Sequence, residues 1–161
     1  MPAIDQGLEP TDYLTLDQQL CFALAVASRT IISMYRPLLE PLGLTHPQYL
    51  VMVALWQSES LSVSEISQLL QLEPPSVSPV LKRLQSAGLI ERQRDTADER
   101  TVRLTLTEQG RTLREQAVSV PLAIVERIGM SISDLEDLRV SLHQLINRAQ
   151  KAVQEQSSVK E

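Results

Sequence analysis

The spacing of apolar and polar positions along the chain predicts a mostly helical protein. Residues 16–39 carry apolar side chains at spacings of three and four, which is typical of one face of a long α-helix. This apolar stripe consists of Leu16, Leu20, Ala23, Ala27 and Ile31. A second, strongly apolar helix is expected over residues 46–56, with Pro47 in its first turn, where a missing N–H costs nothing.

Two short helices with clear start signals are expected next. Ser62 and Glu65 have the spacing of a capping box, in which each side chain satisfies the other residue's backbone N–H. This box predicts a helix over residues 63–70. After a tight connection, Pro74 and Pro75 favour a second start, and the helix is expected to end at Ala87 before Gly88.

The periodicity changes after this point, and short strands are expected before the chain returns to helix. Residues 89–92 and 101–106 have strand patterns, with residues 93–100 as the hairpin tip. One helix is then expected over residues 108–128 with a bend at Pro121. Another is expected over residues 134–152, with a capping box formed by Ser133 and Glu136.

This order of elements predicts an α+β, mostly helical fold built around a winged helix-turn-helix. A short helix, a tight turn, a capped second helix and a two-stranded hairpin make up that motif. We expect residues 46–107 to form the DNA-binding region. Residues 12–45 and 108–155 would form N-terminal and C-terminal dimerisation helices, because apolar stripes outside the motif must be buried somewhere and a two-fold dimer is the commonest solution.

Composition narrows the chemistry that the chain can support. One cysteine, Cys21, excludes an intrachain disulfide and a multi-cysteine zinc site, and with only two histidines we expect no metal or other cofactor. The first residues lack the pattern of a signal peptide, and no apolar run approaches the roughly 18 residues of a membrane span. A cytoplasmic protein without a membrane partner is therefore expected.

The distribution of charge is more informative than the total. The net charge of −5 by itself argues against a nucleic-acid partner. Residues 82–103, however, carry six basic and four acidic side chains, so positive charge is concentrated in the predicted motif. This places a candidate surface for duplex DNA on the second helix and the hairpin.

Four polar residues of that second helix are candidate DNA contacts. Hydroxyl groups near a helix start can meet base edges or phosphates, and basic groups further along can neutralise phosphates. The candidates are Ser76, Ser78, Lys82 and Arg83, with Val77, Val80, Leu81 and Leu84 expected on the buried side. The alternative is an ordinary solvated helix face, which the place of these residues inside the motif makes the weaker interpretation.

Residues 98–107 of the hairpin read DERTVRLTLT, which has the pattern D-x-R…L-x-L-T. This is the wing motif of the MarR family of transcription regulators, which the sequence resembles from about residue 16 to residue 152. An acid two residues before an arginine on a hairpin tip can orient the guanidinium, and a narrow minor groove attracts such a side chain. We therefore assign Arg100 to the minor groove and Asp98 to orienting it. The alternative is a solvated hairpin with a weak surface ion pair.

A narrower resemblance, to the organic-hydroperoxide-sensing OhrR-type branch, implies what is sensed. It is carried by residues 20–24 (LCFAL), 35–39 (YRPLL) and 47–50 (PQYL). The resemblance implies that Cys21 is oxidised to a sulfenic acid and that Tyr35 is one of two tyrosines that hydrogen-bond its sulfur. His46 stands where the second tyrosine would be, and Ala25 replaces a further family tyrosine.

The spacing along the first helix constrains how this thiol site can form. Cys21 and Tyr35 are 14 positions apart, about 21 Å along one straight helix, so they can meet only across a dimer interface, as the family implies. With no second cysteine, the sulfenate must be capped by a small thiol, cyclise with a backbone nitrogen or oxidise further. A nearby His46 would support the thiolate by hydrogen bonding or charge.

These observations predict a non-enzymatic repressor that binds a pseudo-palindromic operator as a homodimer and is released when organic hydroperoxide or a related oxidant acts on Cys21. One alternative keeps the DNA-binding role but replaces the oxidant with a small aromatic ligand. Two further alternatives belong to other classes: a thiol peroxidase, for which the chain lacks a resolving cysteine, and a winged helix used only for protein contacts.

Overall fold

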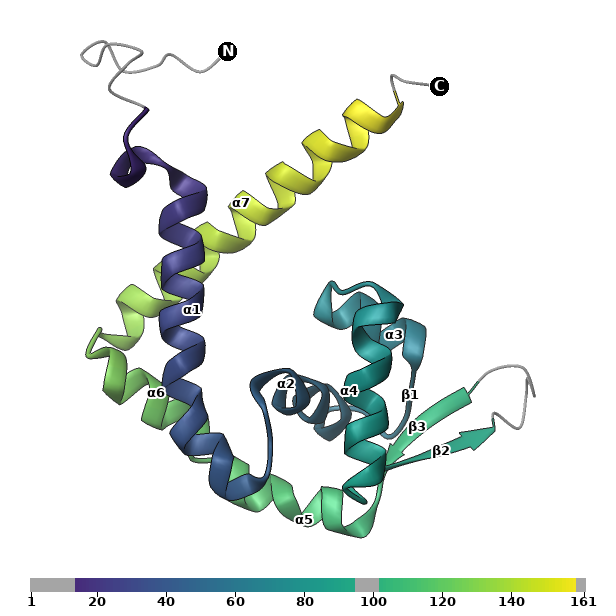
Figure 1. Cartoon of the computed structure of the whole chain (residues 1–161). Helices are drawn as coiled ribbons and strands as arrows, with labels where there is room; N and C mark the ends of the chain where they lie inside the picture. The colour runs from purple at the N-terminus through teal and green to yellow at the C-terminus, as the bar shows by residue number, and fades with distance from the viewer. Residues whose placement is uncertain (1–13, 95–101, 159–161) are drawn as a thin grey trace. The chain divides into compact units, whose positions relative to one another are not determined.

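The computed structural model describes residues 14–94 and 102–158, and the chain divides into two compact units between Val120 and Pro121. The first unit contains the N-terminal helix and the winged helix-turn-helix, and the second contains most of α6 and all of α7. None of the described helices is long and apolar enough to cross a membrane. The elements, labelled in Figure 1, are η2 (Leu16–Gln18), α1 (Leu20–Leu39), η3 (Glu40–Leu42), α2 (His46–Trp56), β1 (Leu61–Ser62), α3 (Val63–Leu70), α4 (Pro74–Ser86), β2 (Ile90–Arg94), β3 (Val102–Leu106), α5 (Glu108–Ala117), α6 (Val120–Ile128) and α7 (Ile132–Ser158).

The N-terminal helix begins later than the apolar pattern predicts. Residues Leu16–Gln18 form a separate 3-10 turn, because Gln19 takes an extended backbone conformation, and α1 starts at Leu20. Gly43, with φ +67°, then reverses the chain direction in the left-handed region. The start of α2 at His46 is fixed by Gln48, whose Oε1 accepts a hydrogen bond of 2.8 Å from the Thr45 N–H.

The helix-turn-helix forms as the capping signals predict. The Ser62 N–H donates to Glu65 Oε2 at 2.6 Å, and the Glu65 N–H donates to Ser62 Oγ at 3.1 Å, so both halves of the capping box are present. Helix α4 ends one residue earlier than expected, at Ser86, and Gly88 has φ +71°. The apolar sides of α2, α3 and α4 meet in one core, whose most deeply buried side chains include Val51, Met52, Leu55, Ile66, Val77, Leu81 and Leu84.

The sheet contains one strand more than the sequence predicts. Its order is β1-β3-β2, and all pairs are antiparallel. The additional strand β1 has only two residues and pairs Leu61 with Leu104 and Ser62 with Arg103. Strands β2 and β3 run side by side and extend away from α4 as the wing (Figure 1). The capping box of α3 is thereby placed beside strand β3 of the wing.

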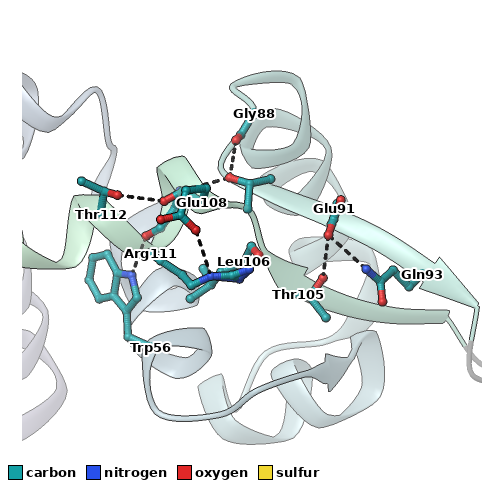
Figure 2. Close-up of polar contacts among 11 residues, drawn as sticks. Trp56, Gly88, Glu91, Gln93, Thr105, Leu106, Glu108, Arg111 and Thr112 are labelled. Atoms are coloured by element: carbon teal, nitrogen blue, oxygen red, sulfur yellow. Dashed lines mark hydrogen bonds and ion pairs between the residues drawn. The ribbon is translucent and has the colours of Figure 1, made fainter.

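A set of polar contacts fastens the base of the wing to α5, as Figure 2 shows. The Thr107 hydroxyl donates to the Gly88 carbonyl at 2.6 Å and accepts from the Gly110 N–H at 3.0 Å. The Trp56 indole N–H donates to the Gly110 carbonyl at 2.9 Å, and Arg111 donates to the Leu106 carbonyl at 2.7 Å. Helix α2, the wing and the start of α5 therefore form one interlocked structure.

The helices after the wing differ from the sequence prediction in two ways. The helix expected over residues 108–128 is interrupted at residues 118–119, so that α5 and α6 are separate helices and Pro121 is the second residue of α6, where its missing N–H costs nothing. Helix α7 begins at Ile132 and runs to Ser158, beyond the expected residues 134–152.

The capping box expected from Ser133 and Glu136 is wrong. Ser131 caps the helix instead, because its Oγ accepts a hydrogen bond of 3.1 Å from the Asp134 N–H and donates to the Asp134 carboxylate. Glu136 lies one turn further along the helix and pairs with Arg139. The cap of α7 therefore lies two residues before the serine that the sequence analysis expected.

Candidate functional site

The second helix of the motif, α4, presents its predicted polar residues to solvent. Val77, Leu81 and Leu84 are buried against the core, whereas Ser76, Ser78, Lys82 and Arg83 are exposed. The helix contains two basic residues and no acidic one. Its free face is therefore positive and carries hydroxyl groups near its N-terminal end.

One of these hydroxyls is already engaged inside the helix. The Ser78 Oγ donates to the Pro74 carbonyl at 3.0 Å, the back-bonding to residue i−4 that serine commonly makes in helices. Its oxygen keeps lone pairs that can accept a further hydrogen bond. Ser78 is consequently suited to accept from a donor on a base edge or from an ordered water rather than to donate to a phosphate.

The two strands of the wing are among the described residues, but the tip that joins them is not. Asp98 and Arg100, the predicted minor-groove pair, lie outside the described residues. Within the strands, Arg92 is exposed on β2 and pairs across the sheet with the fully buried Leu104 on β3. The wing therefore buries Leu104 and Leu106 of β3, whereas residues 91–93 of β2 are exposed.

An ion pair that the sequence analysis missed joins the wing to the first helix of the motif. Arg103 on β3 donates to Glu65 Oε2 on α3 at 2.5 Å, and the same oxygen accepts from the Ser62 N–H. These contacts hold the pKa of the Glu65 carboxyl below its ordinary value of 4.5, and the hydrogen bonds with Ser62 contribute more to this shift than Arg103 does. The capping carboxylate therefore also positions the wing.

The predicted sensor thiol lies on α1, away from the helix-turn-helix motif. Cys21 is the second residue of α1 and is exposed. Tyr35 lies on the same helix 14 positions later, so the two side chains are about 21 Å apart along the axis and do not meet within the chain. The structure therefore leaves the thiol accessible and separates it from its predicted partner in the same protomer.

Tyr35 and His46, by contrast, do come together. The rings of Tyr35 and His46 pack edge to face with centroids 4.9 Å apart, and the ring centroid of Tyr49 lies 5.9 Å from that of Tyr35. Burial lowers the pKa of His46 and raises the pKa of both tyrosines, because each charged form would lose water. At physiological pH this cluster is therefore neutral, and His46 can offer a hydrogen bond but not a positive charge.

A cavity of about 800 Å³ opens beside this aromatic cluster. It lies between the second half of α1 and the start of α2, and its polar lining includes Arg29, Arg36 and His46. Apolar atoms of Ile32 and Leu44 form part of its wall. The cavity combines cationic and apolar surface on the face where the sequence predicts the thiol chemistry.

A helix-turn-helix with an exposed basic second helix, joined to an antiparallel hairpin, defines a winged helix DNA-binding protein. The model of the MarR family matches residues 44–102. The organic hydroperoxide resistance transcriptional regulator of Bacillus subtilis is 41% identical over 135 residues, which span 84% of this chain and 92% of that protein. This chain belongs to the MarR family.

Solved structures agree with this assignment. The chain is similar to reduced AbfR bound to DNA, with a TM-score of 0.76 and 27% identity over 90% of this chain and 99% of the other. It is also similar to overoxidized AbfR bound to DNA, with a TM-score of 0.71 and 28% identity over 88% and 99% of the two chains. The protein is thus a DNA-binding transcription regulator and not an enzyme, as the sequence predicts.

Proposed function

We propose that the protein is a repressor that binds a pseudo-palindromic operator as a homodimer and is released when organic hydroperoxide oxidises Cys21. The observation that carries this proposal is a single, exposed cysteine at the start of α1 in a chain 41% identical to an organic hydroperoxide resistance regulator. Since the partner is duplex DNA, the protein would act in the cytoplasm.

The DNA contacts are assigned from the exposed face of α4 and from the wing. Ser76 would meet a base or a phosphate in the major groove, and Ser78 would accept a hydrogen bond from a base edge or an ordered water. Lys82 and Arg83 would neutralise phosphates. Arg100, oriented by Asp98, would enter the minor groove from the wing tip. Two copies of α4 in a dimer would then reach successive major grooves about 34 Å apart.

Dimerisation through the terminal helices is supported by the apolar side chains that α1 leaves uncovered. Leu20, Phe22, Val26 and Ile32 are all exposed in the single chain. A surface with this many large apolar groups on one helix is expected to be buried against a partner. Residues 12–45 and 108–155 are accordingly assigned to dimerisation, and residues 46–107 to DNA binding.

In the dimer, the Tyr35–His46 pair of one protomer would meet Cys21 of the other. The Cys21 thiolate attacks the distal oxygen of the hydroperoxide, the O–O bond breaks, and the alkoxide leaves and takes a proton to become an alcohol. The sulfur is oxidised by two electrons to a sulfenic acid. The neutral phenol of Tyr35 and imidazole of His46 would hydrogen-bond the sulfur or the departing oxygen.

The form that leaves the operator is assigned by comparison with AbfR. Because overoxidized AbfR was also solved bound to DNA, further oxidation of the sulfur is the weakest candidate for release. A mixed disulfide with a small thiol adds more bulk at α1 than added oxygen atoms do. We therefore assign release to the sulfenic acid after capping by a small thiol, since the chain has no second cysteine.

The decisive experiment compares the wild type with Cys21→Ser in gel shifts on the DNA upstream of the protein's own gene. Both proteins should bind equally well when reduced, because a serine hydroxyl keeps the size of the thiol. After cumene hydroperoxide and a small thiol, the wild type should lose at least about tenfold in affinity, an effect of about 1.4 kcal/mol, and Cys21→Ser should lose none. Mass spectrometry should find the added thiol on Cys21, and a reductant should restore binding.

A second candidate function is release by a small organic ligand in the cavity lined by Arg29, Arg36 and His46. Its volume of about 800 Å³ lies within the range of small-molecule sites. The same experiment separates the two functions. Release of Cys21→Ser by the hydroperoxide would overturn the thiol mechanism and direct the search to this cavity, and failure of the reduced protein to shift any DNA would overturn both.

A further inference from the structure

A second cavity lies within the winged unit, where α2, the end of β3 and α5 come together. Its volume is about 460 Å³, which is within the range of small-ligand sites. It is separate from the cavity at α1, with which it shares no residue. Figure 2 labels three of its lining residues, Trp56, Leu106 and Arg111.

The lining of this cavity has an apolar part and a cationic part. Leu55, Leu106 and the ring of Trp56 supply the apolar part. The Trp56 N–H is already used by the Gly110 carbonyl, so the indole offers an incoming molecule mainly its hydrocarbon surface. Arg111 and Arg114 on α5 supply two guanidinium groups. Glu59 is the acidic residue of the lining, and Glu108, which pairs with Arg111, lies outside the lining.

The two arginines are placed differently. Arg111 is oriented by its hydrogen bond of 2.7 Å to the Leu106 carbonyl, and its Nε lies 3.7 Å from Glu108 Oε2 in an ion pair within α5. With five N–H donors it keeps others for a ligand. The guanidinium of Arg114, one turn further along α5, has no hydrogen bond or ion pair with the part of the chain that the structure describes. The exposed guanidinium of Arg114 near the buried Leu55 and Leu106 is suited to bind an anion that also has an apolar part.

We propose that this cavity binds an organic monoanion with an apolar body, such as a medium-chain carboxylate. The carboxylate lies between Arg111 and Arg114, and the hydrocarbon covers Leu106 and the ring of Trp56. Because Arg111 also holds the last carbonyl of β3, the ligand sits where the wing is fastened to α5. The site is independent of Cys21 and of the proposed response to hydroperoxide.

The chain carries its own reporter for this site, since Trp56 is its single tryptophan. Titration of the full-length reduced protein with octanoate, which does not absorb where tryptophan is excited, should give a saturable change in fluorescence. Octan-1-ol lacks the charge and acetate lacks the apolar body, so each should bind at least about tenfold more weakly than octanoate. Calorimetry under the same conditions gives the affinity without relying on fluorescence.

Variants then locate the site. Arg114→Gln should weaken octanoate binding about tenfold, and because this guanidinium has no described partner the fold should be unaffected. Arg148→Gln, an exposed arginine of α7, and Arg36→Gln, in the cavity at α1, should bind as the wild type does. No saturable signal, equal affinity in Arg114→Gln, or loss of binding in Arg36→Gln would overturn the assignment.

Discussion

Helices α1 and α2 are both rich in apolar residues, yet the chain buries them to very different extents. The 11 residues of α2 include five buried ones, Gln48, Tyr49, Val51, Met52 and Leu55. The 20 residues of α1 include one, Leu39, at the end that meets α2. Helix α2 packs inside the winged unit, whereas α1 leaves large apolar side chains exposed, on the surface that is assigned above to the proposed dimer.

The same contrast separates the DNA-reading surface from the sensor. The wing and α4 are fixed by contacts within the chain, among them the Glu65–Arg103 pair and the Thr107, Trp56 and Arg111 hydrogen bonds. Cys21 lies instead on the open surface of α1. Oxidation at Cys21 would therefore act first on the contact between protomers and reach DNA by changing how two rigid winged units are held.

The largest effect on stability is expected at Gly110 on α5, where the base of the wing is held by contacts within the chain. A Cβ at this position would lie 2.1 Å from the Leu89 carbonyl oxygen, which is backbone and cannot move aside as a flexible side chain can. Gly110→Ala should lower the free energy of unfolding by about 3 kcal/mol, as overpacking of a close contact does. Urea unfolding followed by circular dichroism measures this loss.

The matched control is Gly43→Ala in the turn between α1 and α2. Gly43 has φ +67°, but a Cβ added there would have nothing within 4 Å, so only the backbone strain of about 1 to 2 kcal/mol remains. Equal losses for the two variants would mean that α5 does not hold the wing base as tightly as the close contact indicates.

The next largest effect is expected on α1. Phe22, which is 43% exposed in the single chain, should lie in the dimer interface, so Phe22→Asp would bury a charge there. We expect the dimer dissociation constant to rise about 100-fold, or about 2.7 kcal/mol, in sedimentation equilibrium, with the unfolding of the winged unit unchanged.

Leu69 on α3 provides the comparison, because it is 60% exposed and lies in the winged region. Leu69→Asp should leave the dimer intact. A dimer that survives Phe22→Asp but not Leu69→Asp would place the interface in the winged unit and reverse the assignment of α1.

A smaller effect, on operator affinity, is expected at the ion pair between Glu65 and Arg103, which joins α3 to the wing. Glu65→Gln keeps the hydrogen bond to the Ser62 N–H but removes the charge that pairs with Arg103. Operator affinity should fall by up to about tenfold, while the slope of log affinity against log salt stays the same, because Glu65 contacts no phosphate. Lys82→Ala should instead flatten that slope by about one unit.

Glu136→Gln removes a comparable carboxylate–arginine pair on α7 and serves as the control.

The contribution of Glu65 to the stability of the fold depends on pH with a defined sign. Since the pKa of Glu65 is lowered in the folded protein, its contribution to stability is present above its ordinary value of 4.5 and is lost as the pH falls below it. A salt slope altered by Glu65→Gln as much as by Lys82→Ala would argue that the variant disturbs the DNA contacts directly.

The winged motif could be predicted from the sequence because its signals are local. The Ser62–Glu65 box, the two prolines at the start of α4 and the change of period after Gly88 each need only neighbouring residues. The helix-turn-helix, the hairpin and the exposed side of α4 were therefore predicted close to their observed positions.

Most of the features that were missed depend on contacts between distant parts of the chain. Strand β1 has two residues and exists because β3 pairs with it, and Arg103 reaches Glu65 across 38 positions of sequence. The Thr45–Gln48 cap of α2 and the Ser131 cap before α7 are local contacts that the sequence analysis did not identify. The contact of His46 with Tyr35 required the turn at Gly43, which brings α2 back against α1.

The smallest expected effect tests whether His46 is held neutral beside Tyr35. Burial lowers its pKa in the folded protein, so as the pH falls below about 6.5 the unfolded chain takes up the proton first and stability declines. Because the ring is only half-buried, solvent screening keeps this decline below about 1 kcal/mol. His46→Gln should therefore flatten the dependence of the unfolding free energy on pH between about 5 and 7. An unchanged profile in His46→Gln would mean that the imidazole is not buried beside Tyr35 in solution, and would remove the support for a neutral ring at the proposed thiol site.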